Sequence, residues 1–275
     1  MNRNKTEVEN FMDFNSDAII TIATRIAADN SKVEEYIKRM VTKNDCEFIY
    51  MHPIDDISLH NTYTQYIKYE AGSEEGVLAL LSSFLLQDTK SKYSDFIDEL
   101  DIGYLSGETS IGEEEFEDLV EQLANKKEIT LIVGDDILGH KHLVNITNLI
   151  RLIDSMTSIN VVLLNKNLAP DLSKEIQLND VEDIQTYNGT VIYIVNSDED
   201  ILKGSNSFAM AAKIKDGDSV NITFGGKTVQ KVFQVDLSVR GTIALYPILQ
   251  ENTNQSTVEE GYRFKQVKIE KVLKS

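Results

Sequence analysis

The hydrophobic pattern of this chain changes its period once, and that change limits the possible folds more than any other feature. Up to about residue 205, continuous apolar runs at 129–133 and 160–164 enclose a helical pattern at 144–156. Strand, helix and strand at this spacing form a βαβ crossover. Continuously apolar strands are typical of a parallel sheet with both faces covered.

Beyond residue 205 the period becomes two. Val220, Ile222 and Phe224 alternate with polar residues, Gly225-Gly226 supplies a hairpin turn, and the run 229–235 returns. Further strands are expected at 242–246 and 264–272. This succession of short strands predicts a small β-barrel.

The fold class is therefore predicted to be α/β, with a Rossmann-like, mostly parallel sheet and flanking helices, followed by a small C-terminal β-barrel. We place the α/β domain at 1–207 and the barrel at 208–275. Other expected strands lie at 18–26, 48–51 and 190–195, and other expected helices at 31–40, 74–86 and 113–124. Ser31 is the expected N-cap of its helix, with Glu34 in the capping-box position, and residues 87–112 have an irregular pattern.

Charge supports the same boundary and excludes some functions. The net charge is −18; residues 213–275 hold 10 Lys and Arg against 7 Asp and Glu, which leaves 17 against 38 upstream. An acidic chain does not suit nucleic acid, whose binding is driven by clustered Lys and Arg. No apolar run is long enough for a membrane-spanning helix, and the polar start lacks the core of a signal peptide, so we expect a cytoplasmic protein.

Cys46 is the single cysteine, which excludes an internal disulfide framework and any cysteine-only metal or iron–sulfur site in this chain. The residue stands at the start of an expected strand. A catalytic thiol is one interpretation, but we favour an incidental buried residue, because free cysteine commonly behaves as a small hydrophobe.

The segment from Gly134 to Lys141 lies where a strand leads into a helix, the usual ligand-binding position in open α/β sheets. It lacks the Gly-Lys-Ser/Thr ending of a phosphate loop. Asp135 and Asp136 would also repel a phosphate unless a metal intervened. We therefore favour a structural turn.

No other segment predicts a site. His140 and His142 are two residues apart and would diverge on a helix, and His52 and His60 complete the four histidines, so a zinc centre is disfavoured. Ser106 lacks the setting of a serine nucleophile. The consecutive acids at 113–115 cannot converge by themselves, and the segment 69–76 is a loop leading into a helix with Ser73 as candidate N-cap. The sequence thus predicts no catalytic, cofactor-binding or metal-binding residue.

Several of these segments, taken in order, resemble the molybdopterin oxidoreductase-like, iron–sulfur subunit of bacterial NADH-quinone oxidoreductase, respiratory complex I. The resemblance rests on the runs 67–81, 132–140, 144–150, 215–222 and 241–247. The last two are similar to the C-terminal barrel of molybdopterin oxidoreductases. The resemblance covers most of the chain and depends on the order of the runs, since no single one is diagnostic.

The resemblance implies a segment of a larger subunit. Members of this family carry iron–sulfur clusters on upstream cysteines, so the natural subunit is expected to continue upstream of Met1. In complex I the downstream part is regarded as a relic of a molybdoenzyme without pterin. We therefore expect a non-catalytic segment without a cofactor, bound to other subunits of the peripheral arm at the inner face of the membrane but not inserted in it. The alternative is a fragment of a molybdopterin-dependent oxidoreductase that binds a pterin dinucleotide, or a free-standing binding module of the same fold.

Overall fold

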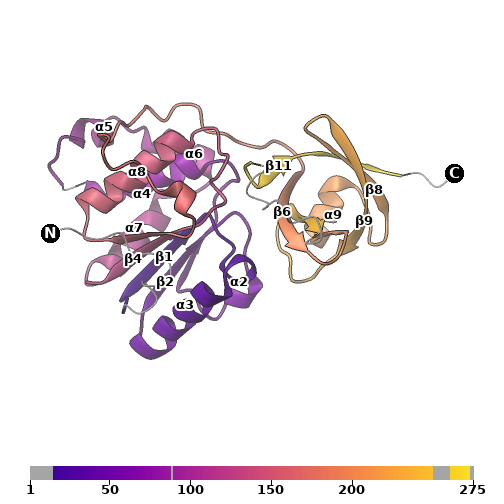
Figure 1. Cartoon of the computed structure of the whole chain (residues 1–275), viewed down its shortest axis with the longest axis horizontal. Coiled ribbons are helices and arrows are strands. Elements are labelled where there is room, and N and C mark those ends of the chain that lie inside the picture. The colour runs from indigo at the N-terminus through magenta and orange to yellow at the C-terminus, as the bar shows by residue number, and fades with distance from the viewer. Residues whose placement is uncertain (1–14, 88, 250–260, 273–275) are drawn as a thin grey trace. The chain divides into compact units, whose positions relative to one another are not determined.

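Two units, each built around its own sheet, make up the chain (Figure 1). The computed structural model describes residues 15–87, 89–249 and 261–272. The first unit holds residues Met1–Pro53, Ser58–Asp135 and Lys141–Gln185, and the second holds Ile54–Ile57, Asp136–His140 and Thr186–Ser275. The domain boundary expected after residue 207 stays a prediction.

A five-stranded, wholly parallel sheet forms the centre of the first unit, in the order β3-β2-β1-β4-β5. Its strands are β1 (Ala18–Ile22), β2 (Glu47–Met51), β3 (Gln65–Ile67), β4 (Ile129–Val133) and β5 (Asn160–Leu163). The predicted α/β class is confirmed, and so is the burial of the sheet. All residues of β1 and β4 are buried, because each strand has neighbours on both sides and helices over both faces.

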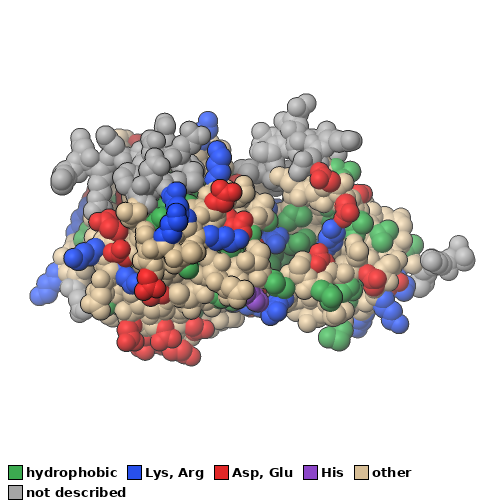
Figure 2. Space-filling view, turned by 90° about the horizontal axis from the view of Figure 1, so that it is seen from below, with side chains coloured by type: hydrophobic (Ala, Val, Ile, Leu, Met, Phe, Trp, Pro, Cys, Tyr) green, Lys and Arg blue, Asp and Glu red, His purple; other side chains and the backbone are tan. Residues whose placement is uncertain are grey.

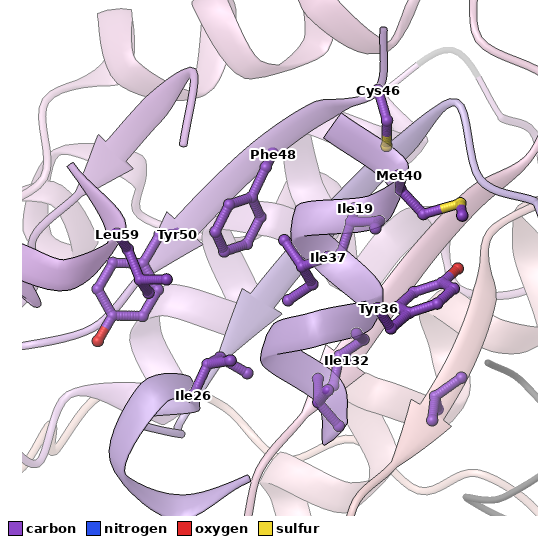
Figure 3. Close-up of a cluster of buried hydrophobic side chains, with 12 residues drawn as sticks. Ile19, Ile26, Tyr36, Ile37, Met40, Cys46, Phe48, Tyr50, Leu59 and Ile132 are labelled. Carbon is purple, nitrogen blue, oxygen red and sulfur yellow. The ribbon is translucent and has the colours of Figure 1, made fainter. Parts of the chain in front are cut away.

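One face of this sheet is covered by α2 (Ile26–Asp29) and α3 (Ser31–Asn44), as Figure 1 shows. The apolar residues of α3 recur at helical spacing and pack on the alternate strand residues that point toward them. Figure 3 shows this cluster, which includes Ile19, Ile37, Phe48 and Ile132.

The other face is covered by α4 (Glu74–Leu86), α7 (Glu113–Leu123) and α8 (Leu143–Met156). Helix α4 packs against both α8 and α7, in agreement with its near-continuous apolarity. The irregular pattern expected for 87–112 is wrong in part, because α5 (Ser94–Asp98) and α6 (Ile102–Thr109) lie there. Gly103 and Gly107 stand inside α6, which packs on α4, so tertiary contacts outweigh their low helix propensity.

The second unit contains a seven-stranded mixed sheet, in the order β11-β6-β10-β7-β9-β8-β12. Its elements are β6 (Val191–Ser197), β7 (Ile201–Gly204), α9 (Asn206–Ala212), β8 (Ser219–Phe224), β9 (Lys227–Val235), β10 (Ile243–Leu249), β11 (Phe264–Gln266) and β12 (Lys268–Lys271). The sheet curls into a half-barrel, so the predicted C-terminal barrel is confirmed. The predicted hairpin is also present: Phe224 pairs with Lys227 across Gly225 and Gly226, which have φ of 54° and 75°.

The two edges of this curled sheet come from consecutive residues. The single strand expected at 264–272 is instead two strands, because β11 pairs with β6 whereas β12 pairs with β8. Val267 lies between them, and its N–H donates to Thr190 O at 2.9 Å. One bent segment thereby pairs with strands at both ends of the curled sheet.

Strand β6 also departs from the sequence-based expectation. The run 190–195 was expected to extend the parallel sheet of the α/β part, but β6 pairs with β10 and β11 in the second sheet. A continuously apolar strand suits any sheet position with both faces covered, so the pattern cannot say which sheet receives it. Among the described residues, no helix is long and apolar enough to cross a membrane.

The start of α3 allows a test of local structure. Ser31 is the wrong N-cap, since Asn30 holds that position and its side chain accepts a hydrogen bond from Val33 N at 3.2 Å. We expect Asn30→Ala to lower the free energy of unfolding by about 1 kcal/mol, because an amide at the helix start loses its acceptor. Urea unfolding measures the change. Ser31→Ala is the matched control and should change stability by less than about 0.5 kcal/mol; equal losses in both variants would contradict the assignment.

Candidate functional site

The carboxyl ends of β1 and β4 lie where the strand order of the first sheet reverses. From β1 the chain continues to β2 and β3 on one side, whereas β4 and β5 lie on the other side. Such a reversal leaves a crevice beside the two central strands, where open α/β sheets commonly bind ligands. The residues at this position are Ala23 after β1 and Gly134 after β4.

The chain packs closely on itself at Gly134. Gly134 N donates to Ile22 O, at the end of β1, at 2.9 Å, so pairing continues one residue beyond β4. A Cβ at Gly134 would lie 2.2 Å from Ala23 O and 2.3 Å from Thr24 Cβ, well inside contact distance. Ala23 turns the chain over Gly134 with a φ of 58°, a conformation that is unusual outside glycine.

The turn after β1 also differs from a dinucleotide-binding turn. Such turns use glycines so that a pyrophosphate can approach the backbone at the start of a helix. Residues 23–29 contain no glycine, and α2 that follows has only four residues. The first unit thus offers no phosphate-binding turn at its topological switch point within the described residues.

The segment singled out after β4 divides between the two units. Gly134 and Asp135 belong to the first unit, residues Asp136–His140 to the second, and Lys141 and His142 to the first again. The strand-to-helix turn is confirmed, because the segment links β4 to α8. The two histidines do not converge: His140 packs edge-on against Tyr262 with ring centroids 5.2 Å apart, whereas His142 contacts Glu75.

Asp136 belongs to a buried polar cluster of the second unit. Its Oδ1 accepts hydrogen bonds from Arg263 Nη1 and from the Tyr193 hydroxyl, each at 2.9 Å. The Arg263 guanidinium lies 4.3 Å from the centroid of the Tyr193 ring and donates through Nε to Ile194 O at 3.0 Å. Asp136 is fully buried and Arg263 is 6% exposed. The negative charge of the buried Asp136 carboxylate is therefore balanced by the Arg263 guanidinium.

The segment 136–140 requires a glycine at position 139. Gly139 has a φ of 75°, and a Cβ there would lie 2.4 Å from Tyr262 N. The backbone of residues 136–140 therefore approaches that of Gly261 and Tyr262 closely. This approach places Asp136 beside Arg263, 127 residues away along the chain.

Glu75 is the second buried carboxylate with clear partners. It lies in the first turn of α4 and is 3% exposed. One carboxylate oxygen contacts Nδ1 of His142, at the N-cap of α8, and Oε1 accepts from Asn145 Nδ2 at 2.8 Å. The carboxylate therefore joins the starts of α4 and α8.

The remaining candidates are not brought together. His52 is buried and stacks on Tyr50, and His60 lies edge-on to Tyr63. Ser73 is the N-cap of α4, but its hydroxyl donates to Glu70 O at 2.7 Å and not to the helix. Ser106 lies in α6, and the acids at 113–115 form the first turn of α7. Across residues 15–87, 89–249 and 261–272, no group of three or more His, Cys, Asp or Glu side chains could hold a metal ion.

Cys46 is buried, with 2% of its surface exposed, and burial raises the pKa of its thiol to about 12. A thiol with so high a pKa is protonated at neutral pH, and the thiolate is the nucleophilic form. Its position in the core around α3 (Figure 3) agrees with the interpretation as a small buried hydrophobe.

Sequence reasoning missed Glu75, Asn145 and Arg263. The first two left a detectable sign, because each is a polar residue within a strongly apolar helical pattern. Arg263 left none, since nothing in its neighbourhood indicates a partner 127 residues away. Figure 2 shows that acidic side chains gather on part of the surface of the first unit, in keeping with the acidic composition of residues 1–212.

Replacement of Gly134 tests whether the switch point is closed. We expect Gly134→Ala to lower the free energy of unfolding by about 2 kcal/mol or more, because the new methyl group meets the backbone of Ala23. Gly107→Ala is the control: it stands in α6 with nothing within 4 Å, and helix propensity predicts a gain of about 0.5–1 kcal/mol. Thermal unfolding of both variants measures the difference, and an unchanged Gly134→Ala variant would show that space exists there.

The buried ion pair gives a second prediction. Arg263→Met should cost about 3–5 kcal/mol of unfolding free energy, because it leaves the Asp136 carboxylate buried without its charge partner. Arg240→Met, at an exposed position of the same unit, should change stability by about 0.5 kcal/mol or less. The double variant Asp136→Leu/Arg263→Met should recover part of the loss, and an equal or larger loss would show that the charge pair is not its cause.

The Cys46 thiol gives a third prediction. At pH 8 a thiol reagent should label Cys46 in the native chain much more slowly than in urea, because its pKa is raised to about 12 by burial. Raising the pH from 7 to 9 should accelerate labelling of the unfolded chain near the ordinary thiol pKa of about 8.5 and leave the native chain slow. Equal labelling rates in the native and unfolded chain would contradict the buried position.

Comparisons with known proteins assign no family to this chain. No protein-family model matches the chain, and no curated protein does. Among solved structures, acetylene hydratase from Pelobacter acetylenicus is similar over 42% of this chain, with 9% sequence identity and a TM-score of 0.33. The match spans 18% of the length of that enzyme. A likeness of this size carries no argument about activity.

Proposed function

We propose that this chain is a non-catalytic structural segment of the molybdopterin oxidoreductase-like, iron–sulfur subunit of an NADH-quinone oxidoreductase. The full subunit would carry iron–sulfur clusters upstream and pass electrons from NADH toward quinone. Support comes from the order of the resembling runs, from 67–81 to 241–247, and from a parallel α/β sheet followed by a curled β-sheet. The proposed partners are the other subunits of the peripheral arm, at the inner face of the membrane.

The observation that carries the non-catalytic part of this proposal is the closed switch point. Ala23 and Thr24 lie against Gly134 where an α/β sheet would otherwise receive a ligand. Asp136 in the second unit and the buried Glu75 in the first are each engaged by side chains of their own unit. A catalytic acid or base needs access to a substrate, and these carboxylates are 0% and 3% exposed.

A pterin dinucleotide does not fit this switch point. Its two phosphates would need basic groups or free backbone N–H groups, as in other dinucleotide sites. The turn after β1 has no glycine, and the position beside Gly134 is occupied by the chain. We therefore expect the purified chain to contain neither molybdenum nor pterin.

Capture from the natural source tests the proposal. Antibodies raised against this chain should recover, from detergent-solubilised membranes, a complex that oxidises NADH and contains the peripheral-arm subunits, as identified by mass spectrometry. Antibody blocked beforehand with purified chain is the control. Recovery of the chain without these subunits would contradict the proposal. Stoichiometric molybdenum or a fluorescent pterin in the recovered protein would instead favour the alternative, a fragment of a molybdopterin-dependent oxidoreductase.

A further inference from the structure

Residues 174–185, here called the strap, run across the helices of the first unit without forming helix or strand themselves. Extended backbone needs partners for its N–H and C=O groups. In the strap these partners are side chains of α8 and α6. The strap is therefore held by side chains and not by the backbone ladder of a sheet.

Three residues of α8, spaced three apart, bind the strap backbone. Arg151 Nη2 donates to Lys174 O at 2.6 Å, and Asn148 Nδ2 donates to Gln177 O at 2.7 Å. Asn145 binds in both directions: its Nδ2 donates to Asn179 O at 3.1 Å, and its Oδ1 accepts from Asn179 N at 2.9 Å. Residues three apart lie on neighbouring turns of one helix face, so the strap runs antiparallel to α8.

The amide of Asn145 is held in this orientation by Glu75. Because Glu75 Oε1 accepts from Asn145 Nδ2, the nitrogen and oxygen of the amide cannot exchange places without losing that bond. His142 in turn contacts the other oxygen of Glu75. Glu75 is therefore a positioning residue for the backbone contact, which explains a buried carboxylate that no catalytic step uses.

The far end of the strap is bound by α6. The Tyr104 hydroxyl donates to Glu182 O at 2.6 Å and accepts from Ile184 N at 3.4 Å. All these hydrogen bonds involve main-chain atoms of the strap. They therefore recognise an extended backbone whatever its side chains.

Side-chain selection comes from apolar residues at every third position. Leu178 packs on the cluster of Leu86, Ile97 and Leu152, and Val181 and Ile184 are buried. Ile184 lies over Gly76, where a Cβ would be 2.5 Å from its Cδ1. A Cβ at Gly72 would likewise lie only 2.8 Å from Gln185 O, so the strap needs glycine at this position.

Charge adds a preference for acidic segments. Lys92 pairs with Glu175, and Lys141 Nζ lies 3.0 Å from Asp183 Oδ2. The strap itself holds four acidic residues and one lysine. These pairs are exposed, so they contribute modestly to affinity and help to choose among partners.

We propose that the surface formed by α8, α6 and the start of α4 is a peptide-binding groove, occupied here in cis by the strap. Its partner class is an extended, acidic peptide segment of another protein, with an apolar residue at every third position. Such a segment competes with the strap, and the strap keeps the groove covered when no partner is present. All of these contacts lie within the first unit.

The test uses the full chain with its strap released. Val181→Asp/Ile184→Asp should free the groove, because it places two charges where apolar side chains are buried. A labelled synthetic peptide of residues 174–186 should bind this variant, as followed by fluorescence anisotropy, and should bind the wild-type chain at least about tenfold more weakly because the strap acts at high local concentration. Ile184→Ser is the milder variant if the double variant does not fold.

Peptide variants separate backbone recognition from nonspecific apolar binding. Asn179→Pro in the peptide removes the N–H that Asn145 accepts and should weaken binding about tenfold, whereas Asn179→Ala keeps that N–H and should leave binding unchanged. Full-length chain with Asn145→Ala in addition to the released strap should bind both peptides equally weakly. The proposal is overturned if neither released variant binds the peptide, or if the proline and alanine peptides bind the released variant equally well.

Discussion

Because β1 and β4 lie side by side at the centre of a parallel sheet, their side chains need apolar cover on both faces. The α2 and α3 layer covers one face, and α4, α7 and α8 cover the other. At the carboxyl ends of these strands, Ala23 and Thr24 pack against Gly134. They can do so because glycine has no Cβ. The chain thus packs on itself at Gly134, at the carboxyl ends of the two central strands.

Polar groups inside the chain serve as connections between distant segments. Arg263 neutralises Asp136 within the second unit, and Glu75 ties His142 and Asn145 together within the first. Breaking one partner of such a pair is costly because a buried charge remains. Asn145 then uses its remaining hydrogen-bonding capacity on the strap, so a buried carboxylate ends up orienting a contact with extended backbone.

Much of the fold could be predicted because it depends on local patterns. The runs at 129–133 and 144–156 and the Gly225-Gly226 hairpin each have the predicted type, since apolar period and turn chemistry act over a few residues. Weak or ambiguous patterns were misjudged. Helix α6 contains Gly103 and Gly107 and is stabilised by α4, and Asn30 caps α3 one residue before the expected Ser31.

The sequence by itself determined the α/β class, the curled C-terminal sheet and the absence of a phosphate-loop ending after β4. Tertiary structure alone decided which sheet receives β6, that Asp136 meets Arg263, and that α8 binds the strap through Asn145, Asn148 and Arg151. The physical reason is separation along the chain. Periodicity reports which face of an element is buried, whereas pairing between residues up to 127 positions apart is set by how the elements pack, and it leaves no sign in the sequence around either partner.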